Sequence, residues 1–252
     1  MRPRHLTACA RSLLMLLGLA GGIWSGATLP AFRSAAAAND VTSRILAGSR
    51  FQSGTLGDVL ASILASPAPL VQRSDLPRAE ALVRLRILEE AIGRKDLDQV
   101  DRESATADAR LKFALVLNPA DSFLWLMLYS EEIAREGFAE TTVTFLEQSY
   151  ATGPLEAWIA LYRNRLALAA FASLNETMQA KVVSEFAGLV ESDFAEDATL
   201  NLMGVGWKRR DRLLASLANV NLIPREAFAK RLSREGLKVS VPGVELEDRL
   251  WR

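Results

Sequence analysis

The chain has 252 residues, half of them apolar and 24% charged, which is ordinary for a folded protein and excludes wholesale disorder. Residues 1–38 hold four arginines and no acid, so the rest carries 26 basic against 30 acidic side chains, a net charge of −4 that argues against nucleic-acid binding. One cysteine, Cys9, and one histidine, His5, exclude internal disulfides, Cys/His zinc sites and histidine-dependent triads from the body.

Residues 1–38 have the three parts of an export signal: early arginines, an apolar stretch at 13–23, and small residues with cleavage sites after Ala27 or Ala38. The alternative is an uncleaved membrane anchor at about 12–32, the length that a bilayer requires. A third interpretation is a buried helix. The first two place the body outside the cytoplasm, in the periplasm or on the periplasmic side of an inner membrane, because arginines stay on the cytoplasmic side.

We expect residues 39–76 to form a linker with one short amphipathic helix, whose apolar residues are Leu56, Val59, Leu60, Ile63 and Leu64. From Pro77, apolar residues recur every three or four positions and predict a helix at 78–92 that ends at Gly93. The same spacing predicts a partner helix at about 98–117.

Residues 118–154 predict a helical hairpin with its elbow at Gly137. Asn118 suits the N-cap and Pro119 the first helical position. Seven apolar residues follow at 123–129, and a helix that is apolar around most of its circumference must lie between neighbours.

Two more helices are predicted at 155–172 and 175–191, separated by a capping box at 173–176. We expect residues 192–236 to form C-terminal helices that pack on this array, and residues 237–252 to form an extended tail. No pair of strands is predicted, so the expected fold is all-α: stacked antiparallel helical hairpins after the N-terminal segment.

Proline and tryptophan spacings of 33 to 42 residues are typical of stacked helical hairpins. Residues 77–191 resemble tetratricopeptide repeats, because four residues lie at or within one position of that repeat's signature: Trp125, Leu128, Phe145 and Pro154. Tyr129 and Thr141 depart from it, standing where glycine and alanine are usual. The resemblance implies a short helical solenoid that binds another protein.

The junction at 149–156, followed by Trp158 and residues 163–165, is similar to exported or membrane-anchored helical proteins of bacterial polysaccharide assembly systems. This resemblance implies an accessory role in exopolysaccharide biosynthesis or export. The implied partner is another envelope protein of unknown identity, with membrane contact through the N-terminal segment if it is not cleaved.

Aromatic residues and arginines gather around the central turn and the next helix, where they could line a partner groove: Tyr129, Tyr150, Tyr162, Arg163 and Arg165. Tyrosines at helical spacing are also typical of a core boundary. A second candidate is a basic patch beside Trp207 that could meet anionic polymers or lipid headgroups: Lys208, Arg209, Arg210 and Arg212. Its alternative is a solvated helix start.

No catalytic, cofactor or metal residue is predicted. The expected function is a non-enzymatic interaction or scaffold module of the bacterial envelope. The alternative is a carbohydrate-active enzyme that uses paired carboxylates, which requires two acids facing each other across a sugar. The adjacent pairs at 89–90 and 131–132 project about 100° apart on their helices, which does not favour that arrangement.

Overall fold

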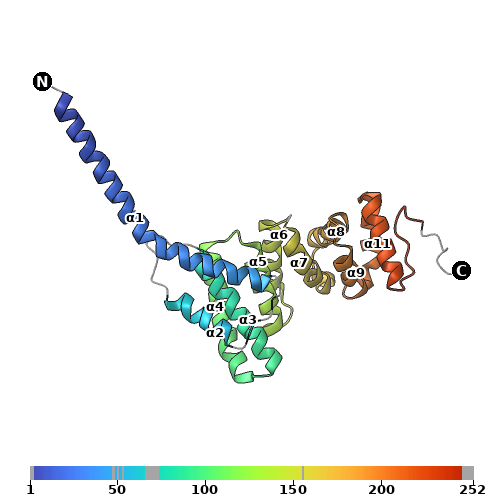
Figure 1. Cartoon of the computed structure of the whole chain (residues 1–252). Coiled ribbons are helices and arrows are strands. Elements are labelled where there is room, and N and C mark those ends of the chain that lie inside the picture. The colour runs from blue at the N-terminus through green and yellow to red at the C-terminus, as the bar shows by residue number, and fades with distance from the viewer. Residues whose placement is uncertain are drawn as a thin grey trace. The chain divides into compact units, whose positions relative to one another are not determined.

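The all-α prediction is confirmed: in the computed structural model, every regular element of the described residues is a helix (Figure 1). The structure describes residues 3–46, 49, 51–52, 54–65, 74–154 and 156–245. The chain divides into two compact units, Met1–Pro119 and Ala120–Arg252, and each is described by itself.

The first unit contains α1 (Pro3–Leu46), α2 (Thr55–Ala65), α3 (Asp75–Arg94) and α4 (Leu97–Leu117). The helices α3 and α4 are the pair predicted at 78–92 and 98–117, and α2 is the predicted short amphipathic helix. The predicted end at Gly93 was wrong, because α3 continues through Gly93 to Arg94 and its C-cap is Lys95, in a left-handed conformation (φ 59°). Both α1 and α2 pack against α3. Their contact is a small core of Val41, Leu56 and Val83.

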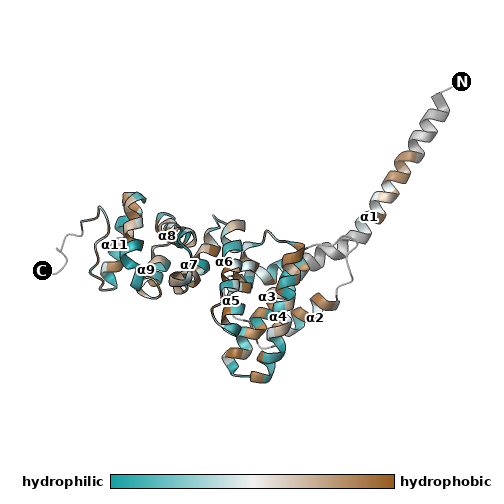
Figure 2. Ribbon diagram, turned by 180° about the vertical axis from the view of Figure 1, so that it is seen from behind, coloured by the Kyte–Doolittle hydropathy of each residue, from teal (hydrophilic) through white to brown (hydrophobic). Residues whose placement is uncertain are grey.

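The helix α1 continues without a break through residue 38, where the signal or anchor segment was predicted to end. Large apolar side chains between Leu13 and Trp24 are exposed, and Figure 2 shows brown bands along this part of α1. Among the described residues, no helix combines the length and the apolar character that crossing a membrane would require.

The second unit is a run of consecutive helices from α5 to α11 (Figure 1). Their bounds are α5 Ser122–Glu136, α6 Glu140–Thr152, α7 Ala157–Ala169, α8 Glu176–Glu191, α9 Ala195–Met203, α10 Arg210–Ser216 and α11 Leu222–Arg234. Three short 3₁₀ helices lie between them, at Phe171–Ser173, Trp207–Arg209 and Leu217–Asn219. Hydrophobic and hydrophilic residues mix along these helices (Figure 2), as expected of helices with one packed and one solvated side.

The central hairpin is confirmed as α5 and α6, with Gly137 at the elbow in a left-handed conformation (φ 80°). Five of the seven residues at 123–129 are buried and the other two are half-buried, which confirms that this apolar helix is enclosed. Trp125 stacks on Phe145 of α6 at 6.0 Å between ring centroids. The helix pairs α5–α6 and α7–α8 make this unit a helical-repeat-like array.

Two predicted N-caps were wrong. Asp121, rather than Asn118, caps α5, because its carboxylate accepts the amide of Leu124 at 3.1 Å, whereas Asn118 ends α4. Asn175 caps α8 by accepting the amide of Met178 at 2.9 Å. The predicted capping box at 173–176 does not form, because Ser173 is wound into a 3₁₀ helix.

The predicted tail is described as far as residue 245, and residues 237–245 contain no helix. Val241 is buried, and Arg225 of α11 donates a hydrogen bond to the carbonyl of Pro242 at 2.6 Å. The last residues of this prediction, 246–252, lie outside the described part of the chain.

Candidate functional site

Arg163 of α7 is fully buried and binds both neighbouring helices. Its Nε and Nη2 donate to one oxygen of Glu185 on α8, at 2.9 and 2.7 Å. Its Nη1 donates to the carbonyl of Ser149 at 2.6 Å, and Nη2 also donates to the carbonyl of Gly153 at 3.0 Å. These two carbonyls lie at the end of α6, where the carbonyl of Ser149 also accepts the amide of Gly153 at 3.2 Å and a positive charge is favourable. A single guanidinium thus ties the end of α6 to α8.

The second oxygen of Glu185 accepts the hydroxyl of Tyr150 at 2.6 Å and the side-chain amide of Asn164 at 3.4 Å. Arg163 stacks over the Tyr150 ring, with its guanidinium carbon 4.1 Å from the ring centroid. Asn164 also donates to the carbonyl of Val182 and accepts the amide of Asn201. We call these residues, Tyr150, Arg163, Asn164 and Glu185, the arginine network.

Burial raises the pKa of Glu185, more strongly than Arg163 and the hydrogen bonds to its carboxylate lower it. Burial, reinforced by the neighbouring carboxylate, holds the pKa of Tyr150 well above its ordinary value. Tyr150 therefore stays protonated at neutral pH, and its hydroxyl donates a hydrogen bond to Glu185. Because both carboxylate oxygens are engaged by fixed donors, Glu185 is placed to hold helices together rather than to exchange protons with a substrate.

The turn that presents the Gly153 carbonyl to Arg163 requires a glycine. A Cβ at position 153 would lie 2.6 Å from the Cβ of Ser122, and closer still to its hydroxyl, at the start of α5. The backbone at Gly153 has a φ of −142°, which any residue adopts. Glycine is therefore required here by the close approach of two helix ends and not by an unusual conformation.

Beside the arginine network lies a pocket of about 440 Å³, which we call the α7–α8 pocket. Its walls are mostly apolar and include Ala157, Ala160, Leu189 and Phe194, with Tyr150 and Glu185 at one side. Lys181 and Ser184 are exposed at its edge. Gly188 also lines it, and a Cβ added there would meet no atom within 4 Å.

A second apolar pocket, of about 270 Å³, is lined by Tyr129 and by Leu166 and Ala169 of α7. Ala157 and Leu166 are two and a half helical turns apart, so the two pockets lie on opposite faces of α7. The hydroxyl of Tyr129 is buried and has no hydrogen-bond partner among the described residues. Burial raises the pKa of Tyr129 to about 12.

The five predicted groove residues do not share one surface. Tyr150 and Arg163 lie together in the arginine network, and Tyr129 is buried in the other pocket. The remaining two, Tyr162 and Arg165, are exposed on α7. The structure thus brings together two of the five.

Two residues of the arginine network, Asn164 and Glu185, were not predicted as site residues. Glu185 lies on the stripe of α8 formed by Val182, Phe186 and Leu189, all of which are buried. A charged residue on an apolar stripe is the signal that could have identified it, because a buried charge requires a partner.

The predicted basic patch lies on the 3₁₀ helix at 207–209 and on α10. Lys208, Arg209 and Arg212 line a pocket, whereas Arg210 stacks on Trp207 with its guanidinium carbon 5.0 Å from the ring centroid. The patch is therefore divided between a concave site and an exposed aromatic ring.

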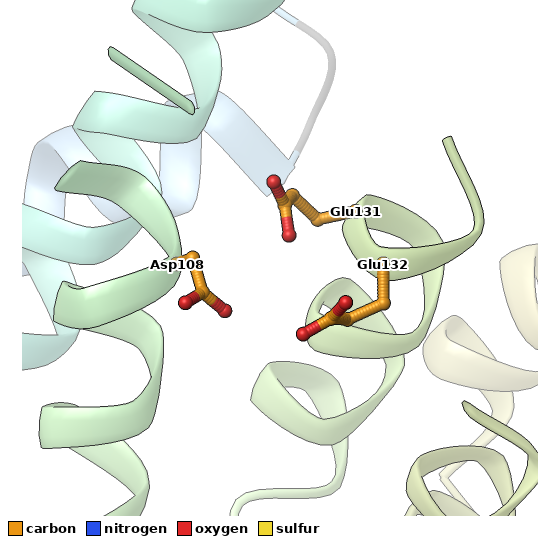
Figure 3. Close-up of side chains that lie close together, drawn as sticks. All are labelled: Asp108, Glu131 and Glu132. Atoms are coloured by element: carbon orange, nitrogen blue, oxygen red, sulfur yellow. The ribbon is translucent and has the colours of Figure 1, made fainter. Parts of the chain in front are cut away.

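The adjacent acids of α5, Glu131 and Glu132, line none of these pockets. Figure 3 shows Glu131 and Glu132 leaving α5 at consecutive positions, and Glu132 accepts a hydrogen bond from Arg135 at 2.7 Å. Asp108, drawn in the same view, belongs to α4 of the first unit, where it pairs with Lys112 at 2.8 Å.

Comparisons of the chain with protein-family models, with curated proteins and with solved structures found no match.

Proposed function

We propose that this protein is a non-enzymatic interaction module, and that its α7–α8 pocket receives an apolar side chain of a partner protein. The observation that carries the proposal is the pocket itself, an apolar recess of about 440 Å³ with polar groups at its edge. A recess with apolar walls and a few polar groups is what an anchoring side chain requires.

The arginine network supports this function because it fixes one side of the pocket. Tyr150 and Glu185 line the recess and are held by Arg163 through contacts of 4.1 and 2.7 Å. A pocket whose side chains are already ordered loses little conformational entropy when it is filled. Binding energy then comes from burial of apolar surface in the pocket. Lys181 can also contact polar or acidic residues of the partner that lie next to the inserted side chain.

The consecutive helix pairs of the second unit support a solenoid of the tetratricopeptide type as the architecture of this module. The arginine-rich, then apolar, N-terminal composition supports a setting in the bacterial envelope, where the partner is an accessory or component of exopolysaccharide assembly. The solenoid architecture and the envelope setting are both parts of the proposal.

The chemistry of the pocket favours binding over the alternative of glycan hydrolysis. Hydrolysis of the two-acid type needs a pair of carboxylates across the substrate. The α7–α8 pocket is lined by one carboxylate, Glu185, and both of its oxygens accept hydrogen bonds from within the protein.

The test fills the pocket without disturbing the core. Gly188→Leu places a side chain in the recess from an open position on α8, and it replaces a poor helix former with a good one. A photo-crosslinking residue at Ser184, at the pocket edge, captures the partner in cells of the native host. We expect a discrete adduct with the parent chain and its loss in the Gly188→Leu chain.

Gly93→Leu is the matched control, because Gly93 is also an exposed helical glycine without an atom within 4 Å of an added Cβ. It lies on α3 and lines none of the three pockets described above. The proposal is wrong if the adduct persists in Gly188→Leu, or if Gly93→Leu loses it equally.

A further inference from the structure

The basic pocket is a concave site of about 330 Å³ within the second unit. Phe171, Ala172 and Gln179 line one side, from the 3₁₀ helix at 171–173 and from α8. Lys208, Arg209, Asp211 and Arg212 line the other, from the 3₁₀ helix at 207–209 and from α10. It shares no lining residue with the α7–α8 pocket, so it is a separate site.

Two guanidinium groups are held on one aromatic ring in this pocket. The guanidinium carbons of Arg209 and Arg212 lie 5.7 and 5.4 Å from the centroid of Phe171. Cation–π contact fixes the charged ends of two long side chains near each other and leaves their N–H groups available. Like charges so placed repel each other, and a bound anion relieves that repulsion.

Gln179 orients one of these arginines. Its amide nitrogen donates to the carbonyls of Phe171 and Leu174, at 3.2 and 2.9 Å. Its oxygen is thereby turned toward Arg212 and accepts a hydrogen bond from Nη1 at 2.7 Å. The donor is thus positioned before any ligand arrives, which lowers the entropic cost of binding.

The three cations of this pocket form no ion pair among the described residues, although Asp211 also lines it. The cations are Lys208, Arg209 and Arg212. Asp211, which is 90% exposed, lies 3.7 Å from Arg210. Three cations and one acid leave the lining with a net charge of +2. A local excess of positive charge in a chain with a pI of 6.7 points to a localised anion site rather than a general affinity for polyanions.

We propose that the basic pocket binds a phosphate group, carried by a small phosphorylated compound or by a lipid headgroup. The planar fork of a guanidinium matches two oxygens of a phosphate, and two arginines with one lysine suit a dianion better than a single carboxylate. The volume lies at the lower end of the range for small-ligand sites, which fits a phosphate with a short attached group.

The experiment titrates the full chain with inorganic phosphate by isothermal calorimetry, at constant ionic strength set with chloride. We expect saturable binding, weakened about tenfold by Arg209→Gln and by Arg212→Gln, since each variant removes a charge-assisted hydrogen bond. Arg210→Gln is the matched control, because it removes the same charge from the same segment but from a side chain that stacks on Trp207 outside the pocket.

A second arm measures co-sedimentation with vesicles of phosphatidylcholine that contain phosphatidic acid, with and without free phosphate. Vesicle binding that needs Arg209 and Arg212, but not Arg210, and that free phosphate displaces, supports a headgroup as the source of the phosphate. Binding to phosphate alone supports a soluble ligand. Absence of binding in both arms, or equal weakening by Arg210→Gln, overturns the proposal.

Discussion

Arg163 donates two hydrogen bonds to a single carboxylate oxygen of Glu185, from Nε at 2.9 Å and from Nη2 at 2.7 Å, across 22 positions of sequence. The guanidinium is fully buried and the side chain of Glu185 is 7% exposed. A charge pair so far from water is costly to break, because removing either residue leaves the other buried without a counter-charge. Loss of either residue of this pair should therefore destabilise the second unit.

We expect Arg163→Met to lower the free energy of unfolding by about 3–5 kcal/mol, because Glu185 loses its counter-charge and the carbonyls of Ser149 and Gly153 each lose a hydrogen bond from the guanidinium. Urea denaturation followed by circular dichroism measures the change. Arg165→Met, an exposed position on the same helix, is the control, with an expected change below about 0.5 kcal/mol. Similar losses in both variants would contradict the assignment.

The double variant Arg163→Met with Glu185→Met should be more stable than the sum of the single changes predicts, because no unpaired charge remains. A double-mutant cycle in urea should give a coupling energy of at least about 1 kcal/mol. Additive losses would show that the two side chains stabilise the fold independently.

The two buried tyrosines should respond oppositely to loss of the hydroxyl. Tyr129→Phe removes a buried hydroxyl that has no partner among the described residues, so we expect a gain of about 1 kcal/mol in the free energy of unfolding. Tyr150→Phe removes a 2.6 Å hydrogen bond to a carboxylate, and we expect a loss of about 2 kcal/mol. The urea midpoints of the two variants measure the direction of each change in stability. A lower stability of Tyr129→Phe would be inconsistent with an unpartnered hydroxyl.

Alkaline pH should destabilise the protein through Tyr129. Its folded pKa of about 12 lies above the ordinary value of 10.0, so the unfolded chain releases this proton first. The contribution of the Tyr129 proton to the free energy of unfolding is complete below pH 10. It is lost progressively as the pH rises from 10 toward 12. Urea midpoints measured between these values should fall less steeply in Tyr129→Phe than in the parent. Parallel slopes would rule out Tyr129 as a contributor.

Gly153→Ala should lower the free energy of unfolding by about 2 kcal/mol, because the added Cβ overlaps Ser122. The backbone at this position tolerates alanine, so Ser122→Gly in the same chain should recover most of the loss. Gly188→Ala is the comparison, and its open position should give a gain of up to about 1 kcal/mol. Failure of Ser122→Gly to rescue would mean that the clash is not the cause.

The helices could be predicted because their apolar residues recur at helical spacing, and the run at 123–129 required enclosure whatever its neighbours were. The capping roles of Asp121 and Asn175 were missed for a local reason. Asn118 and Ser173 are also good capping residues, and only the path of the backbone decides which side chain meets a free amide.

The arginine network could not be predicted from local patterns. Arg163 was assigned to a groove because aromatic residues gathered with arginines are typical of a binding surface, and nothing near it in sequence indicates Glu185 as its partner. The basic patch was predicted as a cluster of side chains, but its pocket depends on Phe171, which lies more than 30 residues earlier. Both the arginine network and the basic pocket are formed by contacts between helices that are far apart in sequence.

Because one guanidinium on α7 is bonded both to the end of α6 and to a carboxylate of α8, opening any of these helices breaks hydrogen bonds of Arg163. Backbone amides of all three should therefore exchange with solvent deuterium at a common rate, as one cooperative unit. In Arg163→Met, that shared rate should separate into three.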